Sequence, residues 1–263
     1  MSIPRDSKIN QLMTDWPDGA VMTTPRLKQR GYNAQLLQRY KQGRWVESLG
    51  AGAYKKKGDQ IDWIGAIAAL QEQLAKPIHV GGRSALDLLG KSHYLRLGKD
   101  TLTLFGPPST KLPTWFIKGD WKKKGSYSAR NLFRETTQEF GTKAIGHTKY
   151  SEGRIEVTIS APERAFFELL DGAPESVGYD EAWKILEGLP SLRTNVLQSL
   201  LERCQSVKVK RLFLHLAEKV NHPWFRKLEL EAIDLGSGKR LIYKDGQYDA
   251  KYMITVPKET DES

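Results

Sequence analysis

Four side chains near the N-terminus have head groups that can form two parallel hydrogen bonds, and they recur at helical spacing: Gln35, Gln38, Arg39 and Gln42. Positions i, i+3, i+4 and i+7 lie on one face of a helix. In the major groove of DNA, glutamine makes such paired bonds to adenine and arginine makes them to guanine. This set, the reader stripe, therefore predicts a helix that reads base pairs. An ordinary solvated helix surface is the alternative, although such a surface more often carries Glu and Lys.

The residues around the reader stripe predict how it is held outward. The opposite face of the same helix is apolar and is expected to pack inward through Leu36, Leu37 and Tyr40. Asn33 is placed to cap the helix, because its side chain can accept from the free amides of the first turn. Gly31 turns the chain before the helix and Gly43 closes it. The pattern predicts a helix from about Ala34 to Gln42.

Two further helices are expected before this one. Pro17-Asp18-Gly19 is a turn sequence that leads into a short apolar strand at residues 20–22. Thr23 or Thr24 then caps a short helix. Residues 8–16 carry apolar side chains at helical spacing, which predicts a helix that packs behind the other two.

A basic two-stranded wing is predicted after the helix of the reader stripe. Residues 44–48 and 53–56 have strand character and flank the turn Gly50-Ala51-Gly52. Lysines that end the second strand are expected to contact phosphates and to add affinity without sequence preference. A lysine triplet alone would be read as a solvated loop, so the prediction depends on the whole order of parts. The candidate DNA-binding residues are Thr24, Arg26, Asn33, Gln35, Gln38, Arg39, Gln42, Arg44, Lys55, Lys56 and Lys57.

Charge is concentrated in the same segment. Residues 1–60 contain 11 Lys and Arg against 5 Asp and Glu, a net charge of +6, whereas the whole chain of 263 residues carries +10. Such a concentration is expected where a protein meets a polyanion. The predicted organisation is α+β: a winged helix-turn-helix DNA-binding domain at 1–60, a larger mixed α/β domain at 61–258 and a flexible acidic tail at 259–263.

The composition is that of an ordinary globular protein and argues against a membrane protein, a disulfide-linked protein and a metalloprotein. The first residues are polar and no apolar run approaches membrane-spanning length, so a cytoplasmic location is expected. The single cysteine, Cys204, lies at helical spacing from Leu200 and Leu201 and is expected in the core. The five histidines are scattered without partner ligands, so neither a metal site nor a cofactor is predicted.

The second domain reads as alternating helices and strands. Helices are expected at 61–74, 84–89, 163–170, 179–187, 192–204 and 207–221, and strands at 78–80, 93–97, 101–105, 154–159, 240–244 and 252–256. The last two strands flank a hairpin-type turn at Asp245-Gly246. Ser160 and Glu163 have the spacing of a capping box, in which the glutamate binds backbone.

Two segments of this domain allow a second interpretation. Gly81-Gly82-Arg83-Ser84 precedes a helix and could bind an anion, but a structural turn is favoured because the segment lacks a nucleotide-binding pattern. Aromatic residues interleaved with lysines at 115–130 could engage single-stranded nucleic acid. Core strands with a charged turn are favoured there.

Several segments together resemble the AbiEi family of antitoxins, and the resemblance extends over nearly the whole chain. These segments are Lys8-Ile9-Asn10-Gln11-Leu12, Asp15-Trp16-Pro17, Leu36-Leu37-Gln38-Arg39-Tyr40, residues 70–74, residues 79–82, residues 104–108, residues 160–165 and residues 206–213. The resemblance implies a component of a bacterial type IV toxin–antitoxin system that acts in abortive infection and phage defence. Its N-terminal winged helix would repress its own operon at inverted repeats, and its C-terminal domain would counter a nucleotidyltransferase toxin. Direct contact with the toxin is left open, and no catalytic residues come with the resemblance.

Two other functions compete with a DNA-binding antitoxin. A nuclease or nucleotidyltransferase would need carboxylates that hold a divalent metal. The candidate acidic residues fall on helices or turns, with no pair on adjacent strands: Asp59 and Asp62, Glu168 and Asp171, Asp180 and Glu181. The chain is therefore expected not to be an enzyme. A transcription factor that senses a small molecule through the apolar and aromatic residues at 115–127 is the other alternative.

Overall fold

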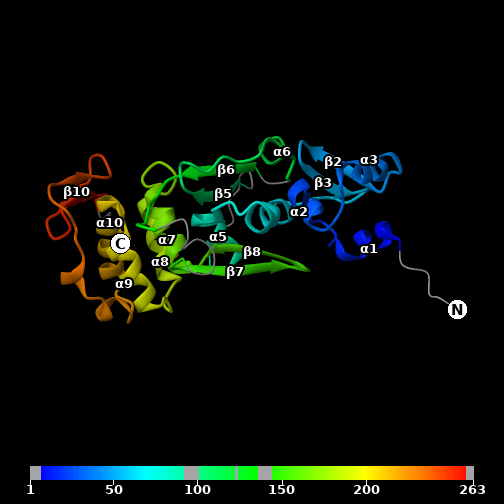
Figure 1. Cartoon of the computed structure of the whole chain (residues 1–263). Coiled ribbons are helices and arrows are strands. Elements are labelled where there is room, and N and C mark those ends of the chain that lie inside the picture. Colours follow the sequence, from blue (N-terminus) through cyan, green and yellow to red (C-terminus); the bar gives the residue numbers. More distant parts are fainter. Residues whose placement is uncertain (1–6, 92–100, 122–123, 136–143, 259–263) are drawn as a thin grey trace.

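The computed structural model describes residues 7–91, 101–121, 124–135 and 144–258. The described parts follow one another along an elongated molecule (Figure 1). A three-helix unit with a small sheet occupies one end, a larger sheet lies in the middle, and a group of helices forms the other end. The α+β class with a smaller N-terminal domain is confirmed.

The first unit has the order of a winged helix-turn-helix. Its elements are α1 (Lys8–Asp15), β1 (Met22–Thr23), α2 (Thr24–Gln29), α3 (Ala34–Gln42), β2 (Val46–Gly50) and β3 (Ala53–Lys56). The three strands pair antiparallel in the order β1-β3-β2. Every helix and strand predicted in this segment is present.

A small apolar core holds these helices together. It consists of buried side chains from all three helices and from the strands: Leu12, Trp16, Met22, Leu27, Tyr32, Leu37, Tyr40 and Val46. The indole N–H of Trp16 donates to the carbonyl of Ala20 at 2.9 Å, so the large ring is buried with its polar atom satisfied. Burial of these side chains supplies most of the free energy that fixes helices as short as α2.

A five-stranded sheet forms the middle of the molecule. Its order is β6-β5-β4-β8-β7, formed by β4 (His79–Val80), β5 (Thr101–Gly106), β6 (Lys124–Ala129), β7 (His147–Glu152) and β8 (Ile155–Ser160). The pairs β5–β6 and β4–β8 are parallel, and β4–β5 and β7–β8 are antiparallel. The helical elements of this part are α4 (Trp63–Ala68), its π-helical continuation (Ala69–Gln73), α5 (Gly82–Leu88) and α6 (Thr114–Ile117).

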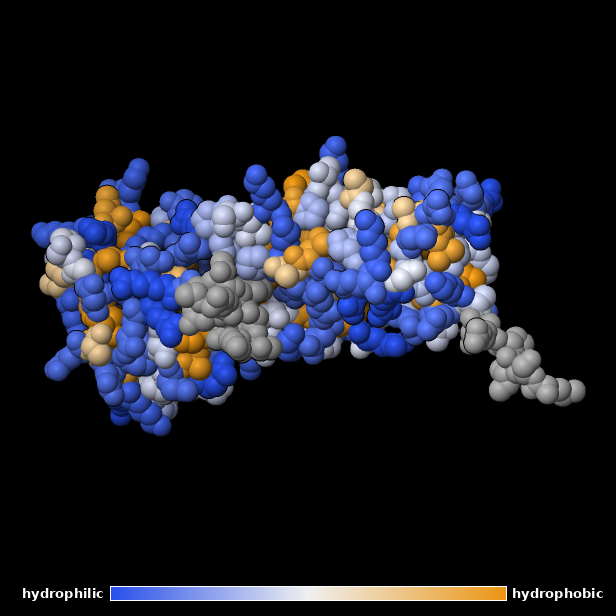
Figure 2. Space-filling model, viewed as in Figure 1, coloured by the Kyte–Doolittle hydropathy of each residue, from blue (hydrophilic) through white to orange (hydrophobic). Residues whose placement is uncertain are grey.

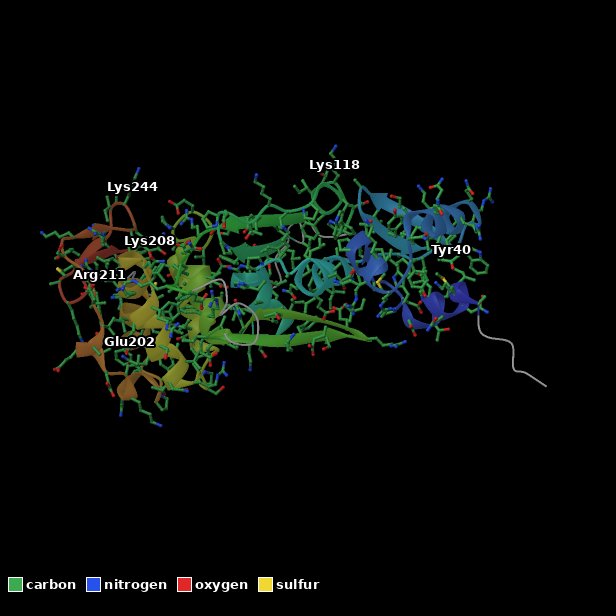
Figure 3. All side chains as sticks on the ribbon, in the orientation of Figure 1. Tyr40, Lys118, Glu202, Lys208, Arg211 and Lys244 are labelled. Atoms are coloured by element: carbon green, nitrogen blue, oxygen red, sulfur yellow. The ribbon has the colours of Figure 1, made fainter. Side chains whose placement is uncertain are left out.

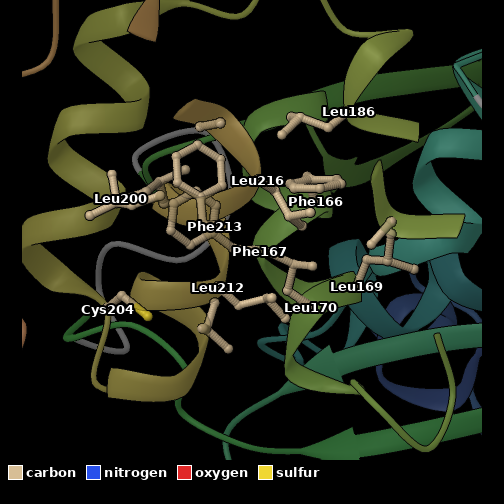
Figure 4. Close-up of a cluster of buried hydrophobic side chains, with 14 of the residues drawn as sticks. Phe166, Phe167, Leu169, Leu170, Leu186, Leu200, Cys204, Leu212, Phe213 and Leu216 are labelled. Atoms are coloured by element: carbon tan, nitrogen blue, oxygen red, sulfur yellow. The ribbon is translucent and has the colours of Figure 1, made fainter. Parts of the chain in front are cut away.

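The far end is mostly helical. It contains α7 (Pro162–Asp171), α8 (Tyr179–Glu187), α9 (Thr194–Arg203), α10 (Val207–Val220), two 3-10 turns (Phe225–Lys227 and Leu230–Ala232), and a small sheet of β9 (Arg240–Leu241), β10 (Gln247–Asp249) and β11 (Ile254–Val256). Figure 4 shows its core, where the rings of Phe167 and Phe213 stack with centroids 4.5 Å apart. Cys204 is buried there, as predicted. Burial raises the pKa of its thiol to about 11, so the residue packs as a small apolar side chain.

The first unit and the central sheet are joined by packing and hydrogen bonds. Val21 and Ala53 belong to the same buried cluster as the apolar residues of the sheet. The side-chain amide of Gln73 donates to the carbonyl of Val21 at 2.7 Å and accepts from the backbone N–H of Thr23 at 2.8 Å. A boundary at residue 60 stays a prediction, but the two sides of that position are not independent in the folded chain.

Two local predictions were wrong: the cap at Ser160 and the strand around Trp115. Ser160 does not cap α7; its hydroxyl donates to Glu168 at 2.7 Å, and Ala161 occupies the cap position. Glu163 does accept from a backbone N–H, as predicted, but that N–H belongs to Arg193, whose guanidinium also donates to Glu163. Trp115 lies in the short helix α6 instead of a strand, although it is buried as expected.

The predicted C-terminal hairpin was also wrong. β9 and β11 are parallel, and the intervening β10, which the sequence patterns missed, is the antiparallel partner of β11. Asp245 does occupy a left-handed turn conformation with φ of 57°. The predicted strand at 93–97 and the predicted acidic tail at 259–263 lie outside the described residues.

Candidate nucleic-acid interface

Helix α3 is fixed at its start and along one face. The side chain of Asn33 accepts from the backbone N–H of Leu36 at 2.9 Å, which is the predicted cap. Leu37 and Tyr40 are buried against the core of the first unit, and Leu36 is half-buried. The orientation of the helix about its own axis is therefore set by the packing of its apolar face.

The reader stripe lies on the opposite face. Gln35, Gln38, Arg39 and Gln42 are all exposed, so their head groups point into solvent rather than into the protein. They occupy successive turns of one helix, as the spacing predicts. The geometry leaves room for a second macromolecule along α3. Figure 3 places Tyr40, on the buried side of this helix, at the end of the molecule opposite to Arg211.

The remaining candidates outside the wing lie at the ends of α2 and α3. Arg26 is exposed on α2, and Arg44 is exposed directly after α3 with φ of 57°. Thr24 is half-buried, and its backbone N–H donates to the carbonyl of Gly52 at 2.9 Å, which ties the start of α2 to the tip of the wing. Asn33 is exposed, but its side-chain oxygen already serves as the helix cap.

The three wing lysines are paired with acidic groups of the chain. Lys56 lies 2.6 Å from a carboxylate oxygen of Asp18, and Lys55 and Lys57 both pair with Glu47. Hydrogen bonds and charge from these lysines lower the pKa of Asp18 and of Glu47. Contact of the lysines with phosphate stays a prediction, and it requires phosphate oxygens to compete with these carboxylates.

Sequence reasoning missed the partner of the lysines and one neighbouring aromatic residue. Glu47 is the register partner of Lys55 across the β2–β3 hairpin, and the spacing around the Gly50-Ala51-Gly52 turn could have revealed that pairing. Trp45 is 49% exposed between α3 and the wing, beside Arg44. A large exposed aromatic side chain next to the reader stripe is a further candidate for contact with a partner.

A second polar group lies deep in the larger domain. The carboxylate of Glu168 accepts hydrogen bonds from Arg164 at 3.0 Å, from Ser160 at 2.7 Å and from the backbone N–H of Gly82 at 3.0 Å, and lies 2.7 Å from Nε2 of His79. Burial raises the pKa of Glu168, but the charge and hydrogen bond of His79 and the charge of Arg164 outweigh burial and lower it. The helix start at Gly82 therefore meets an anion supplied by the protein itself.

The other carboxylates considered for catalysis are also engaged within the fold. Asp59 accepts from the backbone N–H of Gly19 at 3.1 Å, and Asp62 is the cap residue of α4. Asp171 lies 2.9 Å from Arg130, and Glu181 pairs with Arg83. Among the residues that the structure describes, no group of three or more His, Cys, Asp or Glu side chains is arranged to hold a metal ion.

Two family models match the chain and together span nearly its whole length. Residues 5–97 match the family described as "Transcriptional regulator, AbiEi antitoxin N-terminal domain", and residues 99–257 match "Transcriptional regulator, AbiEi antitoxin, Type IV TA system". The chain belongs to the AbiEi antitoxin family. The resemblance noted in the sequence is thereby confirmed, together with its terms antitoxin, type IV toxin–antitoxin system and transcriptional regulator.

A solved structure shares the fold of this AbiEi chain. The crystal structure of the RV2827C protein from Mycobacterium tuberculosis matches with a TM-score of 0.57 and 15% sequence identity, over 95% of this chain and 89% of that one. At this identity the match shows the fold alone. No curated protein sequence matches the chain. Across the described residues, none of the helices has both the length and the apolar character needed to cross a membrane.

Proposed function

We propose that this AbiEi antitoxin binds duplex DNA through α3 and the wing, represses its own operon at inverted repeats near the promoter, and counteracts a nucleotidyltransferase toxin. A cytoplasmic location and a non-catalytic role belong to the same proposal. The observation that carries the DNA-binding part is the exposure of the reader stripe on a helix whose opposite face is buried. Family membership supports the regulatory and antitoxin roles.

The side chains of α3 suit base recognition. Three glutamines and one arginine along a single exposed face can each make paired hydrogen bonds to base edges, worth about 1 to 3 kcal/mol of discrimination per good pair. Phosphate contacts by Arg26, Arg44 and the wing lysines would set the register and add affinity that does not depend on sequence. The net charge of +6 in residues 1–60 supports this division of roles.

A mobility-shift titration of the full chain with its own promoter DNA tests the first part. With about 5 to 8 phosphate contacts, the logarithm of the affinity should fall with the logarithm of salt concentration with a slope of about −5 to −7. Gln38→Ala and Arg39→Ala should each cost about 1 to 3 kcal/mol on the specific site and much less on unrelated DNA. Arg226→Ala, an exposed arginine at the far end of the chain, is the matched control.

Two outcomes would contradict this assignment. An affinity that does not change with salt concentration would show that phosphate contacts contribute little to binding. Equal losses on specific and unrelated DNA for the Gln38 and Arg39 variants would mean that α3 does not read bases.

Neutralisation of the toxin is tested with the full chain, because the first unit and the central sheet share a core. Cells that express the neighbouring toxin gene receive the wild type, the Gln38→Ala/Arg39→Ala double variant or an empty vector. We expect the double variant to restore growth as well as the wild type does while it fails to repress the promoter. Loss of rescue in the double variant would show that neutralisation depends on DNA binding by α3.

A further inference from the structure

A hollow lies between α6 and the edge strand β6 of the central sheet. Its volume is about 730 Å³, and its walls include Leu104, Phe116, Trp121 and Tyr127. Ile117, which is 67% exposed, lies at its rim. In the space-filling view, hydrophobic surface is visible beside α6 (Figure 2). Concave sites of about 300 to 1,000 Å³ with mostly apolar walls are typical of small-molecule binding.

The hollow opens beside β6 at a position where the strand has no side chain on its core-facing side. Gly125 is paired with Leu102 and Tyr127 with Leu104, and both leucines are buried in the core. Since side chains alternate along a strand, Gly125 and Tyr127 share the core-facing side of β6. Among the described residues, no atom lies within 4 Å of a Cβ atom added at Gly125. Its backbone is not left-handed, so the conformation does not require glycine there, and the missing side chain leaves open space.

The aromatic wall is held in place before any ligand arrives. The rings of Phe116 and Trp121 stack with centroids 5.8 Å apart, and the indole N–H of Trp121 donates to the carbonyl of Phe116 at 2.7 Å. The hydroxyl of Tyr127 donates to the carbonyl of Pro107 at 2.8 Å. Trp121 also packs on Gly119, where an added Cβ would lie 2.0 Å from the indole. A ligand would therefore meet rings that are already ordered, which lowers the entropic cost of binding.

The lining has the chemistry of an uncharged site. Among the described residues that line the hollow, Asp120 alone carries a charge, and its side chain is exposed. We propose that this hollow is a binding site for a small, neutral, flat aromatic molecule that packs against Phe116 and Trp121. The flat rings favour a flat aromatic ligand, and the carboxylate of Asp120 in the lining disfavours an anion.

N-phenyl-1-naphthylamine, a neutral aromatic dye that fluoresces in apolar surroundings, is the probe. It is titrated into the full-length wild type and into Gly125→Leu, Gly125→Phe and Gly178→Phe. Gly178 is the matched control, because it also has an ordinary φ and open space around its Cβ position but lies at the start of α8. Circular dichroism and thermal melting of each variant verify folding.

We expect saturable binding of one dye per wild-type chain. Gly125→Phe should weaken the affinity at least tenfold, Gly125→Leu should weaken it less, and Gly178→Phe should leave it unchanged. Absence of saturable binding, or equal binding by all four folded proteins, would overturn the proposal. The experiment contains no DNA, so its result is independent of the function proposed for α3.

Discussion

Nε2 of His79 on β4 lies 2.7 Å from a carboxylate oxygen of Glu168 on α7, although the two residues are 89 positions apart in the sequence. Both side chains are almost completely buried. Arg164 joins the pair through Glu168 and makes a two-point contact with Glu135. This polar network connects the central sheet to the helical end of the molecule, and its charges are compensated within the fold.

Replacing Glu168 with Gln should destabilise the protein strongly. The change removes the negative charge that faces Arg164, and loss of one partner from a buried ion pair costs about 3 to 5 kcal/mol. Urea unfolding at pH 7 measures the loss. Glu202→Gln, an exposed glutamate on α9 (Figure 3), is the control and should change stability by less than about 0.5 kcal/mol. Equal stability of the two variants would contradict a stabilising network.

Stability should also fall in acid in a way that depends on Glu168. Its pKa in the folded chain is lowered by His79 and Arg164 despite the opposing effect of burial. The folded chain thus binds fewer protons than the unfolded chain, so this contribution is complete above the unfolded pKa of about 4.3 and is lost as the pH falls through the folded pKa. Unfolding free energies at several pH values from about 5 down to about 2 should fall less steeply for Glu168→Gln than for the wild type.

Much of the first unit could be predicted from sequence because its determinants are local. The cap at Asn33, the packing face of α3 and the alternation of the wing strands all lie within a few residues of the structure they specify. The paired state of the wing lysines was missed because Glu47 and Asp18 were counted as charges and not as partners.

The larger domain was harder to predict because contacts distant in sequence override local signals there. Ser160 has the spacing of a cap but bonds to the buried carboxylate of Glu168, and Glu163 bonds to Arg193 thirty residues later. The hollow beside β6 depends on which strand lies at the sheet edge. No pattern in the residues of β6 alone carries that information.

Removing the carboxylate that holds two wing lysines should strengthen binding to DNA. Glu47→Gln frees Lys55 and Lys57 from their partner and removes a negative charge near the phosphates. We expect affinity for unrelated DNA to rise about twofold to fivefold at low salt, the range of an exposed ion pair. A mobility shift measures it, with Glu202→Gln as the control. Unchanged or weaker binding would place the wing away from the phosphates.

Variants of Asn33 separate its role as a cap from a role as a DNA contact. Asn33→Ala should lower stability by about 0.5 to 2 kcal/mol, because the N–H of Leu36 loses its acceptor. Asn33→Asp should keep the cap and the stability, since a carboxylate also accepts that bond, but it should weaken DNA binding by charge repulsion if phosphate lies nearby. Urea unfolding and a mobility shift are measured on both variants. An Asn33→Ala protein as stable as the wild type would contradict the role of Asn33 as a helix cap.

Arg211 should be among the least replaceable residues of the helical end. Its guanidinium is completely buried and donates to the carbonyls of Leu235, Gly236, Gly238 and Met253. Burial lowers the pKa of this guanidinium. Arg211→Lys cannot reproduce the fork and should cost about 1.5 to 3 kcal/mol, because hydrogen bonds made by a charged group contribute about that much. Urea unfolding measures the loss of stability, with Lys227→Ala, a change at an exposed residue, as the control. Similar stabilities of the two variants would contradict a structural role for Arg211.

The shared packing of Val21, Ala53 and Gln73 has a mechanical consequence for a dimer on DNA. A base-reading unit on a loose tether would let the remainder of the chain swing, whereas here the contacts of the first unit with the sheet tie the orientation of α3 to that of the sheet. Two copies seated on opposite halves of a palindrome would hold their distant ends at a separation dictated by the spacing of the half-sites. The spacing of the operator half-sites would then determine which partners the two ends can contact together.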